Sequence, residues 1–286
     1  MTSPTRIGVV GTSWWADSMY LPALRGLADV EVAAVLGRNP DRAAAFAQQW
    51  EIPGVFTDAD PFFDQPLDGV IIASANDSHH PLSMQAIDAG LDVLCEKPLG
   101  LDVTQAREMT AAAAAADTIT LVPFTYRYMP VNQYVKRLID EGYLGEAFHL
   151  GLRYFTGFAR DGEYAWRFDR SEAGSGVIGD IGSHFLYLAR WFFGEVASVG
   201  CLSRSFVARD ERPESHDPSD AIEASELGLG GREGVDRAEF GARVGLIGRD
   251  LVGHRARGAE RAIGDRDLAR DNEQIARPNA RHIRSD

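Results

Sequence analysis

Short apolar runs alternate with amphipathic stretches along the first part of the chain. The apolar runs predict buried strands, and the stretches between them repeat hydrophobic residues at the helical period. This alternation predicts an α/β fold with a doubly wound parallel sheet over residues 1–123. The predicted strands are 6–11, 31–36, 67–74, 93–95 and 119–123, and the predicted helices begin near Asp17 and cover 41–49, 81–89 and 102–116.

A second pattern follows this region. A helix is predicted over 130–142, and strict alternation of apolar and polar residues predicts a long strand over 145–155. The glycine-rich stretch 174–182 leads into an apolar helix, and residues 194–206 indicate one more strand. We therefore expect a second, incomplete domain over residues 124–220.

The last part of the chain has a different composition. Of the 27 aromatic residues only Phe240 lies after Phe206, whereas 14 of the 27 arginines do. Such a polar, glycine-broken stretch buries little apolar surface, so we expect residues 221–286 to form an atypical, poorly ordered tail. Our hypothesis is an out-of-frame translation or a truncated, degenerate end, and the alternative is a natural disordered tail.

Composition limits the kinds of binding partner and the cellular compartment that we expect. The formal net charge of −13 disfavours nucleic acid, and no apolar run approaches the length that spans a membrane. The only two cysteines, Cys95 and Cys201, lie in apolar surroundings, and no signal-peptide pattern precedes the first strand. A cytoplasmic protein with a small neutral or polar substrate is expected, and no metal site is predicted.

The turn after the first strand carries an incomplete dinucleotide fingerprint. Gly11 fills the first glycine position, Ser13 stands in the second, and Ala16 is a permitted small residue in the third. In such a turn, backbone N–H groups approach a pyrophosphate at the start of a helix. Gly11, Thr12, Ser13 and Trp14 are therefore candidate cofactor-binding residues, although a plain strand-to-helix turn also fits this pattern.

Arg38 follows the second strand, where no carboxylate stands at the strand end. A carboxylate there would bind the adenosine ribose of NAD, while an arginine can bind the extra phosphate of NADP. Arg38 therefore favours NADP over NAD. The alternative is an exposed arginine in a turn.

Polar side chains gather after the next two strands, where open parallel sheets bind ligands. Ser74, Asn76 and His79 follow one strand, and Glu96 and Lys97 follow the other. Only Lys97 and Lys136 are lysine in a chain that otherwise uses arginine. A partly desolvated lysine can act as an acid or base, which arginine cannot, so Lys97 is a candidate catalytic residue. A solvated lysine at a strand end is the alternative.

A second group of candidate catalytic residues lies in the glycine-rich helix entry. At 100° per residue Asp180 and His184 share a helical face, with an apolar stripe beside it. That spacing would let Asp180 orient His184 or raise its basicity. A solvated acid and imidazole on a helix surface remains the alternative.

Together these motifs resemble the glucose-fructose oxidoreductase and inositol dehydrogenase family (Gfo/Idh/MocA). The resemblance rests on Glu96-Lys97-Pro98 with Asn76 and His79 before it and the Phe124–Tyr128 stretch after it, and it covers about residues 5 to 206. It implies an N-terminal Rossmann domain and then an α+β domain with a mostly antiparallel sheet, often an oligomer interface.

The resemblance also implies roles for individual residues. Lys97, commonly beside a cis Lys-Pro bond, would contact both the nicotinamide and the reacting hydroxyl, and Asp180 with His184 would complete the catalytic set. Arg127 and Tyr128 are expected to bind substrate. The implied activity is NAD(P)-dependent interconversion of a hydroxyl and a ketone on a sugar or polyol. Alternatives are a nucleotide-binding regulator or an inactive truncated homologue without turnover, and an NAD-using glycoside hydrolase of the same family.

Overall fold

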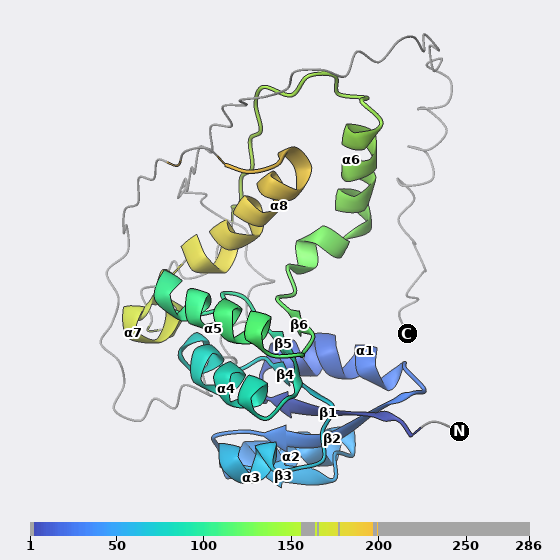
Figure 1. Ribbon diagram of the computed structural model, residues 1–286, viewed down its shortest axis with the longest axis vertical. Coiled ribbons are helices and arrows are strands. Elements are labelled where there is room, and N and C mark those ends of the chain that lie inside the picture. Colours follow the sequence, from blue (N-terminus) through green and yellow to red (C-terminus); the bar gives the residue numbers. More distant parts are fainter. Residues whose placement is uncertain (1–2, 156–163, 165, 177, 197–198, 200–286) are drawn as a thin grey trace, which may run out of the picture. The chain divides into compact units, whose positions relative to one another are not determined.

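The apolar runs of the first region form one parallel sheet in this computed structural model, which describes residues 3–155, 164, 166–176, 178–196 and 199. Its strand order, β3-β2-β1-β4-β5-β6, is the doubly wound order of dinucleotide-binding domains (Figure 1). The predicted parallel α/β fold is confirmed. The strands are β1 (Thr5–Val10), β2 (Val30–Leu36), β3 (Gly54–Phe56), β4 (Gly69–Ile72), β5 (Asp92–Cys95) and β6 (Thr120–Leu121).

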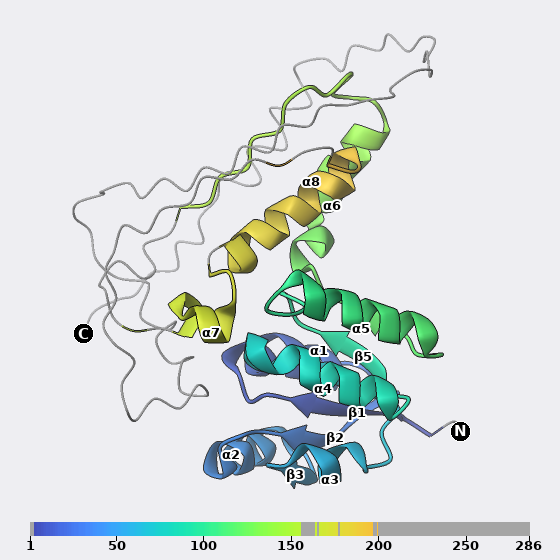
Figure 2. The same ribbon diagram turned by 60° about the vertical axis from the view of Figure 1, so that its left-hand side comes forward.

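Helices cover both faces of the sheet, so its central strands are buried on both sides. One face packs against α3 (Ala59–Phe63), α4 (Asn76–Asp88) and α5 (Val103–Ala115) through a cluster that includes Phe62 and Ile72. The other packs against α1 (Leu21–Arg25) and α2 (Pro40–Trp50) through Val9, Val35 and Phe46. Figure 2 shows α4 and α5 lying together over their face. The sheet is thus a rigid platform whose strand ends can carry a site.

Two local differences from the sequence expectation affect the site. Helix α4 begins at Asn76 and not at Pro81, so Asn76 and His79 lie in its first turns. Between Trp15 and α1 the chain forms a π-helical turn, η1 (Ala16–Tyr20).

A third difference lies outside the site. Residues 51–66, for which no element was predicted, form β3 and α3, both too short to leave a clear periodic pattern.

The described part of the second region is mostly helical. Helices α6 and α8 lie outside the layers of the sheet domain (Figure 1), and Phe124 stacks on Tyr187 of α8 with ring centroids 4.3 Å apart. The elements are η2 (Thr125–Tyr128), α6 (Pro130–Asp140), η3 (Trp166–Phe168), α7 (Arg170–Ala173), η4 (Ile178–Gly182) and α8 (Ser183–Phe193).

The strand predicted over 145–155 does not form. These residues pair with no other strand in the described part of the chain, and Phe148 is 90% exposed. Alternation alone cannot make a strand, because the backbone N–H and C=O groups need a neighbouring strand to pair with. The antiparallel sheet is likewise absent from the described residues. Most of the strand predicted at 194–206, and the whole tail from 221, lie outside them.

Candidate active site

A cavity of about 630 Å³ opens at the carboxyl ends of β1, β2, β4 and β5. This is where doubly wound sheets bind their ligands. Most of the residues singled out in the sequence line this one cavity. They are Gly11, Thr12, Ser13, Trp14, Arg38, Ser74, Asn76, His79, Glu96, Lys97, Asp180 and His184.

Arg127 and Tyr128 do not line it. The Arg127 guanidinium donates a hydrogen bond to the Tyr187 hydroxyl (2.6 Å) and lies over the Trp191 ring, 5.2 Å from its centroid. Tyr128 is 58% exposed. Their neighbours Thr125 and Tyr126 line the cavity instead, because η2 turns successive side chains in different directions.

The loop after β1 lies tightly against the end of β4. Gly11 has φ +101°, and a Cβ added there would lie 2.7 Å from the Ala73 carbonyl oxygen, so this position requires glycine. Ser13 uses its hydroxyl within the loop, donating to the Ala73 carbonyl (2.9 Å) and accepting from the Ala16 N–H (3.1 Å). The departure from the glycine pattern at Ser13 is therefore compensated by two hydrogen bonds.

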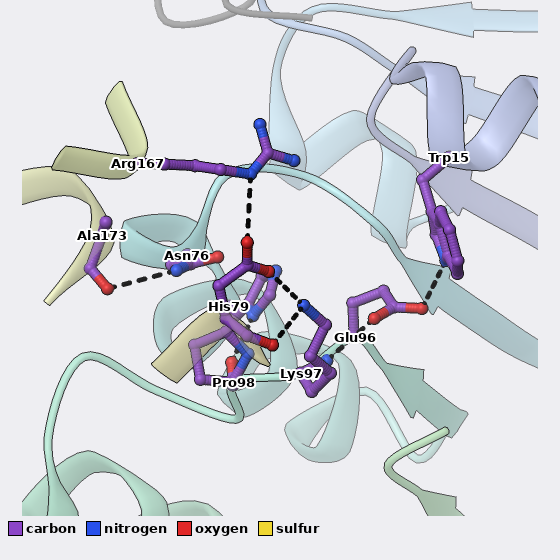
Figure 3. Close-up of polar contacts among 9 residues, drawn as sticks. Trp15, Asn76, His79, Glu96, Lys97, Pro98, Arg167 and Ala173 are labelled. Carbon is purple, nitrogen blue, oxygen red and sulfur yellow. Dashed lines mark hydrogen bonds and ion pairs between the residues drawn. The ribbon is translucent and has the colours of Figure 1, made fainter. Parts of the chain in front are cut away.

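Lys97 and Asp180 form an ion pair across 83 residues of sequence (Figure 3). The Lys97 ammonium lies 2.7 Å from Asp180 Oδ1 and 3.3 Å from the Asp180 carbonyl oxygen. Arg167 Nε lies 3.8 Å from the other carboxylate oxygen. Burial acts to raise the pKa of Asp180, but the charge and hydrogen bond of Lys97, with Arg167, outweigh it and lower that pKa. The Lys97–Pro98 bond is cis, as the family resemblance implies.

His184 is oriented differently from expectation. We expected Asp180 to orient it, but the Asp180 carboxylate binds Lys97, and the His184 ring stacks on Tyr126 with centroids 4.3 Å apart. Residues 178–182 form a π-helical turn, so the 100° rotation per residue assumed from the sequence fails there. His184 is buried on the same face of α8 as Leu188 and Phe192, not on a polar edge.

The chemical state of His184 follows from its surroundings. Burial, and then the charge of Lys97, lower its pKa to about 4, against a smaller opposing effect of Asp180. Its Nδ1 is buried, with no hydrogen-bond partner among the described residues. The ring is therefore neutral at pH 7 and can accept a proton.

Asn76 and His79 fix the backbone around the cavity. His79 Nδ1 lies 2.8 Å from the Pro98 carbonyl oxygen and Nε2 3.1 Å from that of Ser74, so the ring bridges the ends of β4 and β5. Burial lowers the pKa of His79, although both carbonyl oxygens act to raise it. The Asn76 amide donates to the Ala173 carbonyl oxygen (3.2 Å), which ties α4 to α7 (Figure 3).

Glu96 is 7% exposed, and its carboxylate contacts residues that sequence reasoning missed. Oε1 accepts from Trp15 Nε1 (2.7 Å) and from the Tyr20 hydroxyl (2.5 Å), and Oε2 accepts from the Lys97 N–H (3.0 Å).

Sequence reasoning also missed three other residues that line the cavity, namely Tyr126, Trp166 and Arg167. The Trp-Trp pair at 14–15 and the Trp-Arg pair at 166–167 were weak local signals, since no periodic pattern marks either of them.

Two family models match successive parts of the chain. One, described as an oxidoreductase family with an NAD-binding Rossmann fold, matches residues 5–124, and the other, the GFO/IDH/MocA C-terminal domain, matches residues 132–227. The chain belongs to the Gfo/Idh/MocA oxidoreductase family. The resemblance read from Glu96-Lys97-Pro98 and its flanking motifs is thereby confirmed.

Relatives of the chain within this family have names that describe sugar substrates. The chain is 30% identical over 201 residues to a levoglucosan dehydrogenase of Pseudarthrobacter phenanthrenivorans, covering 69% of this chain and 51% of that protein. It is 29% identical to a 1,5-anhydro-D-fructose reductase of Ensifer adhaerens, covering 82% of this chain and 64% of the reductase. The chain therefore spans about half to two thirds of these relatives.

Solved structures give the same likeness. A levoglucosan dehydrogenase in complex with NADH and levoglucosan has a TM-score of 0.67 and 26% identity, covering 75% of this chain and 62% of that one. An oxidoreductase domain protein from Kribbella flavida has a TM-score of 0.63 and 28% identity, covering 68% and 53% of the two chains. The fold class expected from the sequence is confirmed for the sheet domain.

The residues present fit a nicotinamide dinucleotide. Gly11 keeps the loop after β1 free of a side chain where a pyrophosphate needs close backbone approach. The cavity continues from there to Arg38 beyond β2 and to Lys97 beyond β5.

In the described part of the chain, no cluster of three His, Cys, Asp or Glu side chains could hold a metal ion. Among the same residues, none of the helices combines the length and the apolar character that a membrane span requires.

Proposed function

We propose that the chain catalyses NAD(P)-dependent interconversion of a hydroxyl and a ketone on a sugar or polyol. One observation carries the proposal: the Lys97–Asp180 ion pair lies in the same cavity as the loop at Gly11 and the ring of His184. An amine, a carboxylate and a neutral imidazole beside a dinucleotide loop suit proton management during hydride transfer. The sugar-derived names of the relatives support the substrate class.

Each residue has a distinct part in the oxidation direction. The bound nicotinamide supplies the hydride acceptor. Lys97 donates a hydrogen bond to the substrate hydroxyl oxygen and stabilises the negative charge that develops there. Asp180 holds the Lys97 ammonium in place across 2.7 Å. The hydroxyl proton passes to the neutral ring of His184, and the same groups act in reverse during reduction.

We further propose NADP as the preferred cofactor. Arg38 lines the cavity just beyond β2, and no carboxylate occupies the strand end at Leu36-Gly37. A guanidinium there can pair with the 2′-phosphate of NADP, whereas NAD gains nothing from it. We also retain a division into a cofactor domain over 1–123 and a substrate domain over 124–220, which the boundary between the two matched segments supports.

Replacing the lysine tests the function. Lys97→Met should lower turnover of a sugar or polyol by about 10²- to 10⁴-fold while NADPH binding persists. Lys136→Met is the matched control, because Lys136 is the only other lysine and pairs with Asp140 on α6, outside the cavity. Turnover that survives in Lys97→Met would refute the assignment. NADPH binding without any turnover in the wild type would favour a regulatory nucleotide-binding protein.

A further inference from the structure

The buried carboxylate of Glu96 joins the cofactor loop to Lys97. On one side it contacts Trp15, which lines the cavity next to Trp14, and Tyr20, which ends the π-helical turn η1. On the other side it binds the backbone N–H of Lys97. The Trp15–Glu96 bond spans 81 residues of sequence (Figure 3), so it connects two elements that no local pattern links.

The distribution of donors over the carboxylate decides its orientation. Oε1 receives two strong donors, an indole N–H and a phenol O–H, and Oε2 receives the Lys97 N–H. Burial, together with the charge of Glu96, raises the pKa of Tyr20, so its hydroxyl remains a donor at any physiological pH. Rotation would break these hydrogen bonds and leave a buried charged oxygen unpaired, so the donors hold the carboxylate in one orientation.

The orientation matters because Glu96 and Lys97 line the same cavity. Lys97 follows Glu96 directly, and its side chain pairs with Asp180 at 2.7 Å. Without these donors, the buried Glu96 carboxylate would be unpaired and would favour a conformation that pairs it with another donor or a cation. Lys97, the next residue in the chain, carries such a cation. Trp15 and Tyr20 thus keep Glu96 on the Lys97 backbone and leave the ammonium to Asp180.

We propose that Trp15 and Tyr20 are positioning residues that hold the Glu96 carboxylate and, through it, the Lys97 backbone and side chain. The inference rests on the proposed function for its kinetic consequence, but not for its structural one. Because Trp15 lies in the loop that lines the cofactor cavity, the same contacts make the placement of Lys97 depend on that loop.

Conservative variants of the full chain provide the test. Tyr20→Phe and Trp15→Phe each remove one donor from Glu96 Oε1 while keeping an aromatic ring. Each should lower kcat by about 10-fold, with a much smaller change in KM for the cofactor. Because both donors share one acceptor atom, the double variant should lose less than the product of the two single losses.

Trp50→Phe is the matched control. Trp50 Nε1 also donates to a carboxylate over 2.7 Å, that of Asp17 in the same π-helical turn, but Trp50 does not line the cavity. It therefore removes the same kind of bond from the same element without touching Glu96. A loss of kcat in Tyr20→Phe and Trp15→Phe no larger than in Trp50→Phe would overturn the proposal.

A second readout is independent of turnover. The chain has two lysines, so ¹³C-lysine labelling gives two side-chain NMR signals, which Lys97→Met assigns. In Tyr20→Phe and Trp15→Phe the Lys97 Cε signal should shift while that of Lys136 stays in place, and in Trp50→Phe neither should shift. An unmoved Lys97 signal in both variants would overturn the proposal. If no substrate turns over even in the wild type, the proposed function fails, and the NMR comparison still decides the role of Trp15 and Tyr20.

Discussion

The sheet region up to residue 121 and the segment from 124 to 196 meet at one cavity but assemble by different rules. Each strand of the first region finds a parallel neighbour, so its apolar runs become strands close to where the pattern predicts them. The alternating stretch 145–155 finds no partner among the described residues and forms no strand. Yet α8 and η4 still deliver His184 and Asp180 to the cavity.

The difference shows what each region needs in order to contribute to the site. Strand pairing depends on another strand, whereas η4 and α8 form their own backbone hydrogen bonds and need only side-chain contacts with the first region. For η4 that contact is the Lys97–Asp180 ion pair, and the Asn76–Ala173 hydrogen bond links α7 to the first region in the same way.

Breaking the contact between the regions should have the largest effect. Asp180→Asn removes the charged partner of Lys97 and leaves the Gly11 loop intact. We expect turnover to fall by about 10- to 100-fold, as loss of a hydrogen bond to a charged group implies. NADPH affinity should change little, and steady-state kinetics with a parallel binding titration would check both. Equal losses in turnover and in cofactor affinity would contradict the separation.

Strain introduced in the first region should act on cofactor binding. In Gly11→Ala the new Cβ would meet the Ala73 carbonyl oxygen at 2.7 Å and the Ser74 nitrogen at 2.9 Å, at φ +101°. We expect a loss of about 1–3 kcal/mol in the free energy of unfolding, with weakened NADPH binding. Gly142→Ala is the control, because Gly142 has φ +76° with nothing within 4 Å of an added Cβ. Its cost should be smaller and cofactor binding unchanged.

Cofactor choice belongs to the first region alone. Arg38→Ala should weaken NADP binding by about 10-fold and leave NAD binding nearly unchanged, because only NADP carries the phosphate that the guanidinium pairs with. Arg107→Ala, on the exposed face of α5, provides the comparison. Titrations with both nucleotides measure the ratio. An equal effect on NAD and NADP would remove Arg38 from the choice.

The second region should add a small pH dependence to stability. The folded pKa of His184 is lowered to about 4 from 6.5, so the unfolded chain binds a proton there that the folded chain does not. Its contribution to stability is full above pH 6.5 and is lost as the pH falls toward 4, by about 1 kcal/mol after screening by cavity water. Denaturant unfolding of wild type and His184→Gln would show a difference that shrinks with falling pH. A difference independent of pH would contradict the shift.

The residues that the structure brings together at the cavity were selected where the sequence signal was local. Gly11 and Lys97 stand directly after apolar runs, and Asp180 and His184 follow a cluster of glycines, so each could be selected without knowing its partner. The partner of Asp180 differs from the prediction. Helical spacing predicted that Asp180 orients His184. Residues 178–182 form a π-helical turn instead, and the Asp180 carboxylate pairs with Lys97.

Residues whose role depends on distant contacts could not be predicted. Trp15 and Tyr20 bind a carboxylate about 80 residues away, and Arg167 of η3 lies beside Asp180 of η4 through the packing of their own segment. The family resemblance assigned Arg127 to substrate binding, but η2 directs its guanidinium to the Tyr187 hydroxyl. Tertiary packing, not periodicity, decides such contacts.

The most direct test of the account is whether Lys97 senses both regions at once. With ¹³C-labelled lysine, the Lys97 Cε signal should shift on addition of NADPH and should shift again in Asp180→Asn, while the Lys136 signal stays constant in both experiments. A Lys97 signal that responds to neither NADPH nor the loss of Asp180 would mean that the two regions do not share a site, and the proposed enzyme would have no catalytic centre.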